Sequence, residues 1–148
     1  MEIMHGVRAA RGTLTNLKEE LDAGMVGSLR MHLTADVLTD FLQLARAILD
    51  EDSAKAKNVA AVLTAAAFED TIRRMGVSLA GSLGGENLQD VIGSLKTADI
   101  LQPPQLGIAL SYLSFRNHAL HAEWEEIDRA SIHSVLAFVE QLLQKHFG

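Results

Sequence analysis

The chain has 148 residues, a formal net charge of −6 and no cysteine. The absence of cysteine excludes a disulfide scaffold, a cysteine-ligated zinc site and thiol catalysis, and it fits a reducing, cytoplasmic compartment. The acidic balance counts against a non-specific nucleic-acid binder, which typically carries a basic excess. This length predicts a single domain over residues 1–148, and no apolar run approaches the length of a membrane span.

Apolar residues recur at intervals of three and four between the glycine and proline positions, which is the period of an α-helix. Taken in chain order, the predicted helices cover residues 2–23, 28–50, from the Ser53 cap to Gly76, 88–97, from the proline pair at 103 and 104 to Trp124, and from the Asp128 cap onward. Alternation with period two never holds long enough to predict a strand. We therefore expect an all-α bundle of about five to six helices with short connections.

Three of these helices have a clear apolar stripe that we expect to face the core. In the first helix the stripe is Leu14, Leu17 and Leu21. In the second it is Leu38, Phe41, Leu42, Ala45 and Leu49. In the last it is Ile132, Val135, Leu136, Val139, Leu142 and Leu143.

Glu69 stands on the expected apolar stripe of the third helix. The other members of that stripe are Val59, Val62, Ala66 and Ile72. A carboxylate on an apolar face is costly unless it is paired. Either Glu69 is an edge residue bonded to Arg73, four residues on, or it pairs with a group on another helix that function requires. The alanines at 60, 61 and 65–67 favour a close helix–helix or subunit contact beside it.

The fifth helix carries the segment whose residue types best suit catalysis, which contains Arg116, Asn117 and His121. Its expected stripe is Leu106, Leu110, Leu113, Leu120 and Trp124, and Asn117 falls on the same face. Asn117 and His121 are neighbours four residues apart, whereas Arg116 and His121 lie roughly 140° apart around the helix. They would border one cleft with Asn117 between them. The alternative is a set of polar residues that solvates an edge of the bundle.

Other chemistries find less support in the sequence. His118, His121 and Glu125 have the helical spacing of metal ligands, but the Glu-x-x-His pattern of carboxylate-bridged bundles is absent. We therefore expect no metal and no other cofactor. No serine lies in a nucleophile elbow or near an evident base.

The segment SFRNHALHAEWEEIDRASIHSVLAFVEQLL, residues 114–143, resembles the C-terminal half of HEPN (higher-eukaryote and prokaryote nucleotide-binding) domains. Their signature is an arginine, an adjacent polar residue and a histidine four to six positions after the arginine, here Arg116, Asn117 and His121. AAVLTAAAFEDTIRRMG, residues 60–76, is similar to the alanine-rich helix of a bacterial, abortive-infection-like branch, in which a glutamate precedes a hydrophobic–arginine pair. LQDVIGSLKTADIL, residues 88–101, is similar to that branch's linking helix. The resemblance covers about residues 59–147.

The resemblance implies an all-α HEPN-like bundle and a metal-independent RNA endonuclease that works as a toxin or defence effector. Such proteins act as homodimers in which the signature residues of both chains face one cleft. Arg116, Asn117 and His121 would then be catalytic, Glu69 and Arg73 supporting, RNA the substrate, and an antitoxin or defence protein a possible partner. Cleavage would use the RNA's own 2′-hydroxyl and leave a 2′,3′-cyclic phosphate.

A second hypothesis is a non-catalytic, HEPN-like helical interaction or regulatory module. The acidic residues Glu123, Glu125, Glu126 and Asp128 would repel phosphate at the exit of the signature helix. Glu123 also stands where toxins controlled by a nucleotidyltransferase antitoxin carry a tyrosine. The two hypotheses differ on His121, which an enzyme must expose and a module would bury in hydrogen bonds.

Overall fold

A computed structural model describes residues 27–148 of the chain. The chain divides into two compact units, residues 1–36 and 37–148, and the following description concerns the second. The predicted helix over 2–23, with Leu14, Leu17 and Leu21, lies outside the described residues. That residues 1–148 form a single domain stays a prediction.

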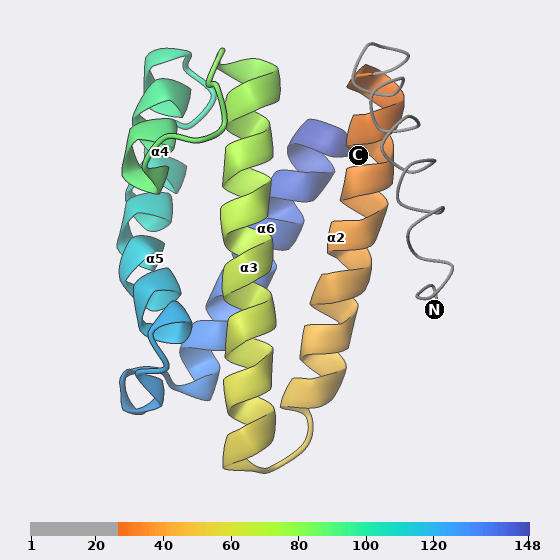
Figure 1. Cartoon of the computed structure of the whole chain (residues 1–148), viewed down its shortest axis with the longest axis vertical. Helices are drawn as coiled ribbons and strands as arrows, with labels where there is room; N and C mark the ends of the chain where they lie inside the picture. The colour runs from red at the N-terminus through yellow and green to blue at the C-terminus, as the bar shows by residue number, and fades with distance from the viewer. Residues whose placement is uncertain (1–26) are drawn as a thin grey trace, which may run out of the picture. The chain divides into compact units, whose positions relative to one another are not determined.

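The described residues form α-helices joined by short connections, with no strand among them, which confirms the all-α prediction (Figure 1). The elements are α2 (Gly27–Leu49), α3 (Ala54–Leu79), α4 (Leu88–Thr97), α5 (Gln105–Leu120), the short 3₁₀-helix η2 (Trp124–Glu126) and α6 (Arg129–Phe147). None of the described helices is both long and apolar enough to cross a lipid bilayer.

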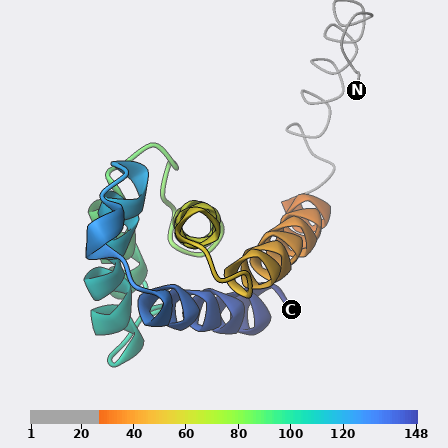
Figure 2. The ribbon, with the colours of Figure 1, turned by 90° about the horizontal axis from the view of Figure 1, so that it is seen from below.

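Helix α3 is the central element, and it packs against α4, α5 and α6 (Figure 2). Its buried positions are mostly short side chains, which let the neighbouring backbones approach closely. They are Ala56, Ala60, Ala61, Thr64, Ala65, Ala67, Phe68, Thr71, Ile72, Met75 and Gly76. The alanine-rich sequence of α3 therefore serves contacts within the chain.

The predicted stripe of α3 is consequently wrong in part. Ile72 is buried, but Val59, Val62 and Ala66 lie on the exposed side of the helix. The physical reason is that neighbours surround much of α3, and the closest approaches select alanine and leave the valines outside. Of the five alanines expected at a close contact, only Ala66 is exposed.

The stripe expected on α5 is also corrected. Its buried residues are Ala109, Phe115 and Ala119, while Leu110 and Leu120 are exposed. As on α3, the close helix–helix contacts are made by small residues and one aromatic ring. Leu106 and Leu113 are partly buried against the core.

Helix α5 ends at Leu120, four residues before the predicted end at Trp124. The N–H of Glu123 donates to the carbonyl of His118 at 2.9 Å, and that of Ala122 to Ala119 at 3.4 Å. Ala122 adopts a left-handed conformation with φ 57°. This is a Schellman motif, which satisfies the last carbonyls and turns the chain out of the helix. Because position 122 is neither glycine nor asparagine, the sequence does not predict this helix ending.

Several local predictions are confirmed. Ser53 Oγ accepts from the N–H of Ala56 at 3.1 Å, and Asp128 Oδ1 accepts from the N–H of Ser131 at 2.7 Å, so both residues are N-caps. Helix α4 has its predicted bounds, and every member of the α6 stripe is buried. In α2, Leu38, Leu42, Ala45 and Leu49 are buried as expected, but Phe41 is 40% exposed.

Gly76 does not terminate α3, which continues to Leu79. A Cβ atom at Gly76 would lie 2.5 Å from Cγ1 of the buried Val91 in α4. Glycine is therefore required for the approach of α3 to α4. The left-handed glycine that follows the helix is Gly81, with φ 69°.

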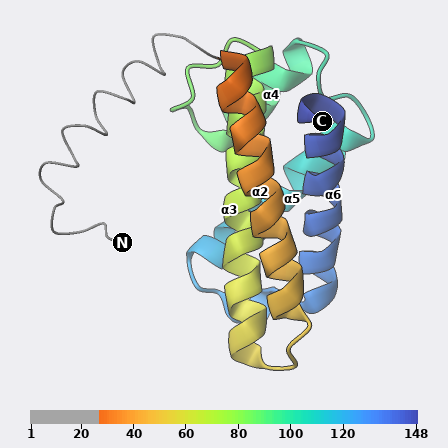
Figure 3. The same ribbon diagram turned by 90° about the vertical axis from the view of Figure 1, so that its right-hand side faces the viewer.

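Two basic residues, Arg129 and Lys57, bind the backbone carbonyls at the ends of neighbouring helices. Arg129, at the start of α6, donates to the carbonyls of Leu49, at the end of α2, and of Glu51 and Ser53 in the α2–α3 connection. Figure 3 shows the start of α6 close to this connection. Lys57 Nζ donates to the carbonyls of Trp124 at 2.9 Å and Ile127 at 2.8 Å. Lys57 thereby holds the chain that follows α5 against α3.

Candidate functional site

The carboxylate of Glu69 joins α3 to α5. Its Oε1 lies 2.7 Å from both Nε and Nη2 of Arg116, and its Oε2 lies 2.8 Å from Nε of Arg73. The predicted pairing of Glu69 is thus confirmed: it bonds both Arg73 on its own helix and a group on another helix, Arg116. Burial alone would raise the pKa of Glu69, but the hydrogen bonds from Arg73 and Arg116 outweigh it and hold the pKa below its ordinary value.

Arg73 extends this network to the connection between α3 and α4. Its Nη1 donates to the carbonyls of Gly84 at 3.1 Å and Glu86 at 2.6 Å. The carboxylate of Glu86 closes the same loop by accepting from Ser82 Oγ at 2.8 Å and from the N–H groups of Leu83 and Gly84. These bonds, the one from Ser82 first, lower the pKa of Glu86 to about 2.

Arg116 is oriented on both sides. Besides Glu69, its guanidinium contacts the neighbouring side chain, with Nη1 donating to Oδ1 of Asn117 at 2.9 Å. The Arg116 side chain is one-quarter exposed, and Asn117 is exposed. Because a guanidinium has five N–H groups, Arg116 keeps donors for a ligand after these contacts are made.

His121 is the C-cap residue of α5 and is exposed. Its backbone N–H donates to Asn117 O at 3.1 Å, whereas its imidazole makes no hydrogen bond or ion pair with any described residue. This exposure meets one requirement of the enzyme hypothesis. Arg116 and Asn117 lie near the end of α5 and His121 caps it, and that the three side chains border one cleft stays a prediction.

His118 is engaged instead by its own helix end. Its Nδ1 lies 3.2 Å from Glu123 Oε1, and its Nε2 lies 3.2 Å from Ser114 Oγ. This set was not predicted from the sequence, although Ser114 and His118 are four residues apart and therefore neighbours on a helix. A serine, a histidine and a glutamate linked in this order could be taken for a catalytic triad. However, Ser114 lies inside α5, where the backbone N–H groups are bonded within the helix and are not free to stabilise an oxyanion. We therefore assign the three residues to the stability of the helix end.

Beyond His121, the surface turns acidic. Ala122, Glu123, Trp124, Glu125 and Glu126 line a shallow hollow of about 310 Å³. The carboxylates of Glu123, Glu125 and Glu126 make this hollow negative, so it repels other anions. No group of three or more potential metal ligands gathers between residues 27 and 148, so His118, His121 and Glu125 do not form one.

The fold and the site define a class: an all-α bundle in which one helix carries an arginine, held in place by a carboxylate on a second helix, and ends at an exposed histidine. Comparisons with family models, with curated proteins and with solved structures gave no match. The likeness to HEPN domains therefore rests on the residues of the chain alone.

Proposed function

We propose that this chain is a HEPN-type, metal-independent RNA endonuclease that acts as a homodimer in the cytoplasm, as a toxin or defence effector. The observation that carries the proposal is the exposed imidazole of His121, which has no partner among the described residues, at the end of the helix that holds Arg116. An imidazole that can accept and donate a proton and a fixed guanidinium are the groups that transphosphorylation of RNA needs.

The reaction follows from these two groups. His121 takes the proton of the RNA 2′-hydroxyl while the 2′-oxygen attacks the adjacent phosphorus. The bond between phosphorus and the 5′-oxygen breaks, and that oxygen takes a proton from a second imidazole. In a homodimer this is the same histidine of the other copy, which answers the need for both a base and an acid. The products are a 2′,3′-cyclic phosphate and a 5′-hydroxyl.

Arg116 supplies positive charge to the phosphorane as negative charge develops on its oxygens. Glu69 fixes the guanidinium in one orientation, Arg73 holds Glu69 from the other side, and the amide oxygen of Asn117 accepts a further hydrogen bond from Arg116. Glu69 also neutralises part of the positive charge of Arg116. A second copy of the cluster would add positive charge to a cleft shared by the two copies and so favour phosphate there.

We assign the proposed dimer interface to α3 and α5. Both helices, which also carry the Glu69–Arg116 network, leave large apolar residues exposed, among them Val59, Val62, Leu110 and Leu120. Exposed apolar surface beside a polar cluster is typical of a protein interface.

The alternative is a non-catalytic interaction or regulatory module. Its specific support is the acidic surface formed by Glu123, Glu125 and Glu126, which suits a basic protein partner better than RNA.

Product chemistry tests the proposal. Purified wild-type protein is incubated with RNA in EDTA, and the fragment ends are identified by mass spectrometry. We expect cleavage that EDTA does not inhibit, with 2′,3′-cyclic phosphate and 5′-hydroxyl ends. Uncut RNA, or ends with 5′-phosphate, would contradict the mechanism and favour the module.

A further inference from the structure

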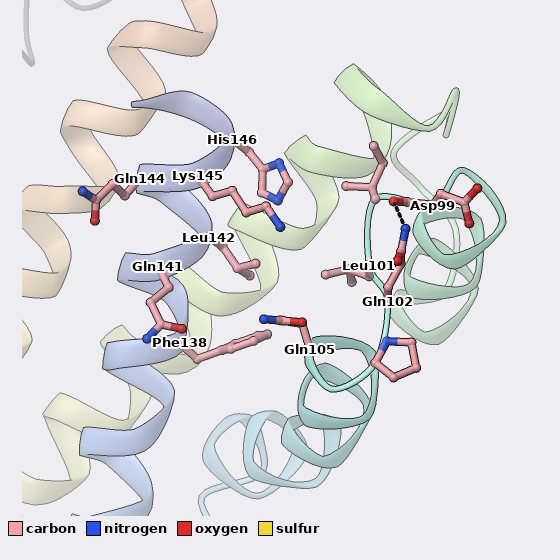
Figure 4. Close-up of a pocket in the computed structure, with 12 residues that line it drawn as sticks. Asp99, Leu101, Gln102, Gln105, Phe138, Gln141, Leu142, Gln144, Lys145 and His146 are labelled. Carbon is pink, nitrogen blue, oxygen red and sulfur yellow. Dashed lines mark hydrogen bonds between the residues drawn. The ribbon is translucent and has the colours of Figure 1, made fainter.

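A cavity of about 450 Å³ lies between the connection that follows α4 and the C-terminal half of α6 (Figure 4). This volume is within the range of small-molecule sites, roughly 300–1,000 Å³. The cavity contains Gln105, at the start of α5, whereas His121 is at the end of the same helix. The rise of an α-helix puts about 24 Å between these two positions, so the cavity is separate from the Arg116 cluster.

One part of the cavity wall is apolar. Phe138 and Leu142 from α6 face Leu101 from the connection, and all three are buried (Figure 4). Such a surface binds the hydrocarbon or aromatic body of a ligand by removing it from water.

Polar groups project into the same space. Figure 4 shows the Lys145 ammonium and the Gln105 amide extending from opposite walls toward the middle of the cavity. Neither side chain makes a hydrogen bond or ion pair with another described residue. His146 Nε2 is covered by protein and has no hydrogen-bond partner among the described residues. These three groups leave donors and acceptors unused around an apolar surface.

Lys145 supplies a positive charge among the residues that line the cavity. Burial, and then the charge of Lys145, lowers the pKa of His146, so its imidazole is neutral at neutral pH. The carboxylate of Asp99 lies at the outer edge, across the cavity from the Lys145 ammonium (Figure 4). A ligand that enters therefore meets the Lys145 ammonium and the Gln105 amide, with the Asp99 carboxylate on the far side.

We infer that this cavity binds a small organic carboxylate, with its apolar body on Leu101, Phe138 and Leu142 and its carboxylate at Lys145. One ammonium matches one negative charge, whereas a phosphate monoester would bring a second charge that no group in the cavity compensates. The Gln105 amide donates a further hydrogen bond to the carboxylate.

Matched probes test this inference on the full chain by thermal denaturation and titration calorimetry. Phenylacetate has the proposed charge and body, phenethylamine has a similar body with the opposite charge, and acetate has the charge alone. A fragment of this size is expected to bind with a Kd of about 1 mM. Phenylacetate should raise the melting temperature in proportion to its concentration, because it binds the folded state. Phenethylamine and acetate should not.

The variant Lys145→Met keeps the length of the side chain and removes its charge, and we expect it to weaken phenylacetate binding at least tenfold. The control Lys96→Met changes a lysine of α4 that is exposed and outside the cavity, and it should bind phenylacetate like the wild type. The inference is overturned if phenylacetate does not bind, if phenethylamine binds equally well, or if Lys145→Met binds like wild type. The readout is binding, so none of these outcomes depends on RNA cleavage.

Discussion

A single carboxylate organises the candidate site at the scale of residues. Glu69 holds Arg116 through one oxygen and Arg73 through the other, and Arg73 passes the contact on to the loop at Gly84 and Glu86. The orientation of Arg116 therefore depends on groups from α3 and from the α3–α4 connection as well as on its own helix. The pairing was predicted from an apolar stripe that is mostly exposed, and it holds because the largely covered Glu69 carboxylate must still find donors.

Replacing Glu69 with glutamine should lower stability by about 2 kcal/mol, because it leaves two partly buried guanidinium groups without their anion. The control is Asp70→Asn, which breaks the more exposed pair with Arg74 and should cost less than about 1 kcal/mol. Urea denaturation of both variants measures the difference. Equal losses would show that Glu69 is merely a surface ion-pair residue.

The same carboxylate predicts a pH dependence. Because the folded-state pKa of Glu69 lies below the ordinary value of 4.5, its stabilising contribution is present above that pH and is lost as the pH falls further. The wild type should therefore lose its advantage over Glu69→Gln on acidification. An advantage that stayed constant below pH 4.5 would contradict the assigned network.

At the scale of elements, two glycine substitutions should act in opposite directions. Gly76→Ala should destabilise the fold by about 1–3 kcal/mol, because the added methyl group overlaps the buried Val91. Gly93→Ala, in the middle of α4 with open space around it, should stabilise by about 0.5–1 kcal/mol. Thermal denaturation distinguishes the two, and destabilisation by Gly93→Ala would indicate an unseen contact on that face.

The left-handed residue after α5 gives a further test. Ala122 has φ 57°, a conformation that costs an L-residue roughly 1–2 kcal/mol and glycine much less. Ala122→Gly should thus stabilise the chain by about 1 kcal/mol without changing the position of His121. A loss of stability in this variant would contradict the Schellman ending of the helix.

The capped starts of helices, the bounds of α4 and single-faced helices could be predicted from sequence because their signals are local, whereas the ends of α3 and α5 could not. The caps Ser53 and Asp128, the bounds of α4 and the stripe of α6 all belong to this group. The buried face of α3 could not, since three neighbours and many alanines obscure the period of its apolar residues. The cavity between the α4–α5 connection and α6 was also hidden, because its walls come from distant parts of the sequence.

At the scale of the whole molecule, the proposed enzyme needs two copies to supply two imidazoles. The protein should sediment as a dimer at tens of micromolar. Val62→Glu, on the exposed side of α3, should produce monomers because it places a charge in the proposed interface. Val37→Glu alters an exposed valine of α2 and should leave the dimer intact. A monomeric wild type would remove the shared cleft.

The most direct test of the proposed function compares two exposed histidines in one RNA cleavage assay with EDTA. His121→Ala should abolish cleavage, whereas His133→Ala, on the surface of α6, should cut RNA at the wild-type rate. His118→Ala should retain most activity, because both of its ring nitrogens are engaged by Ser114 and Glu123. Only the His121 variant should be inactive while remaining folded. Cleavage by His121→Ala at the wild-type rate would contradict the proposed mechanism.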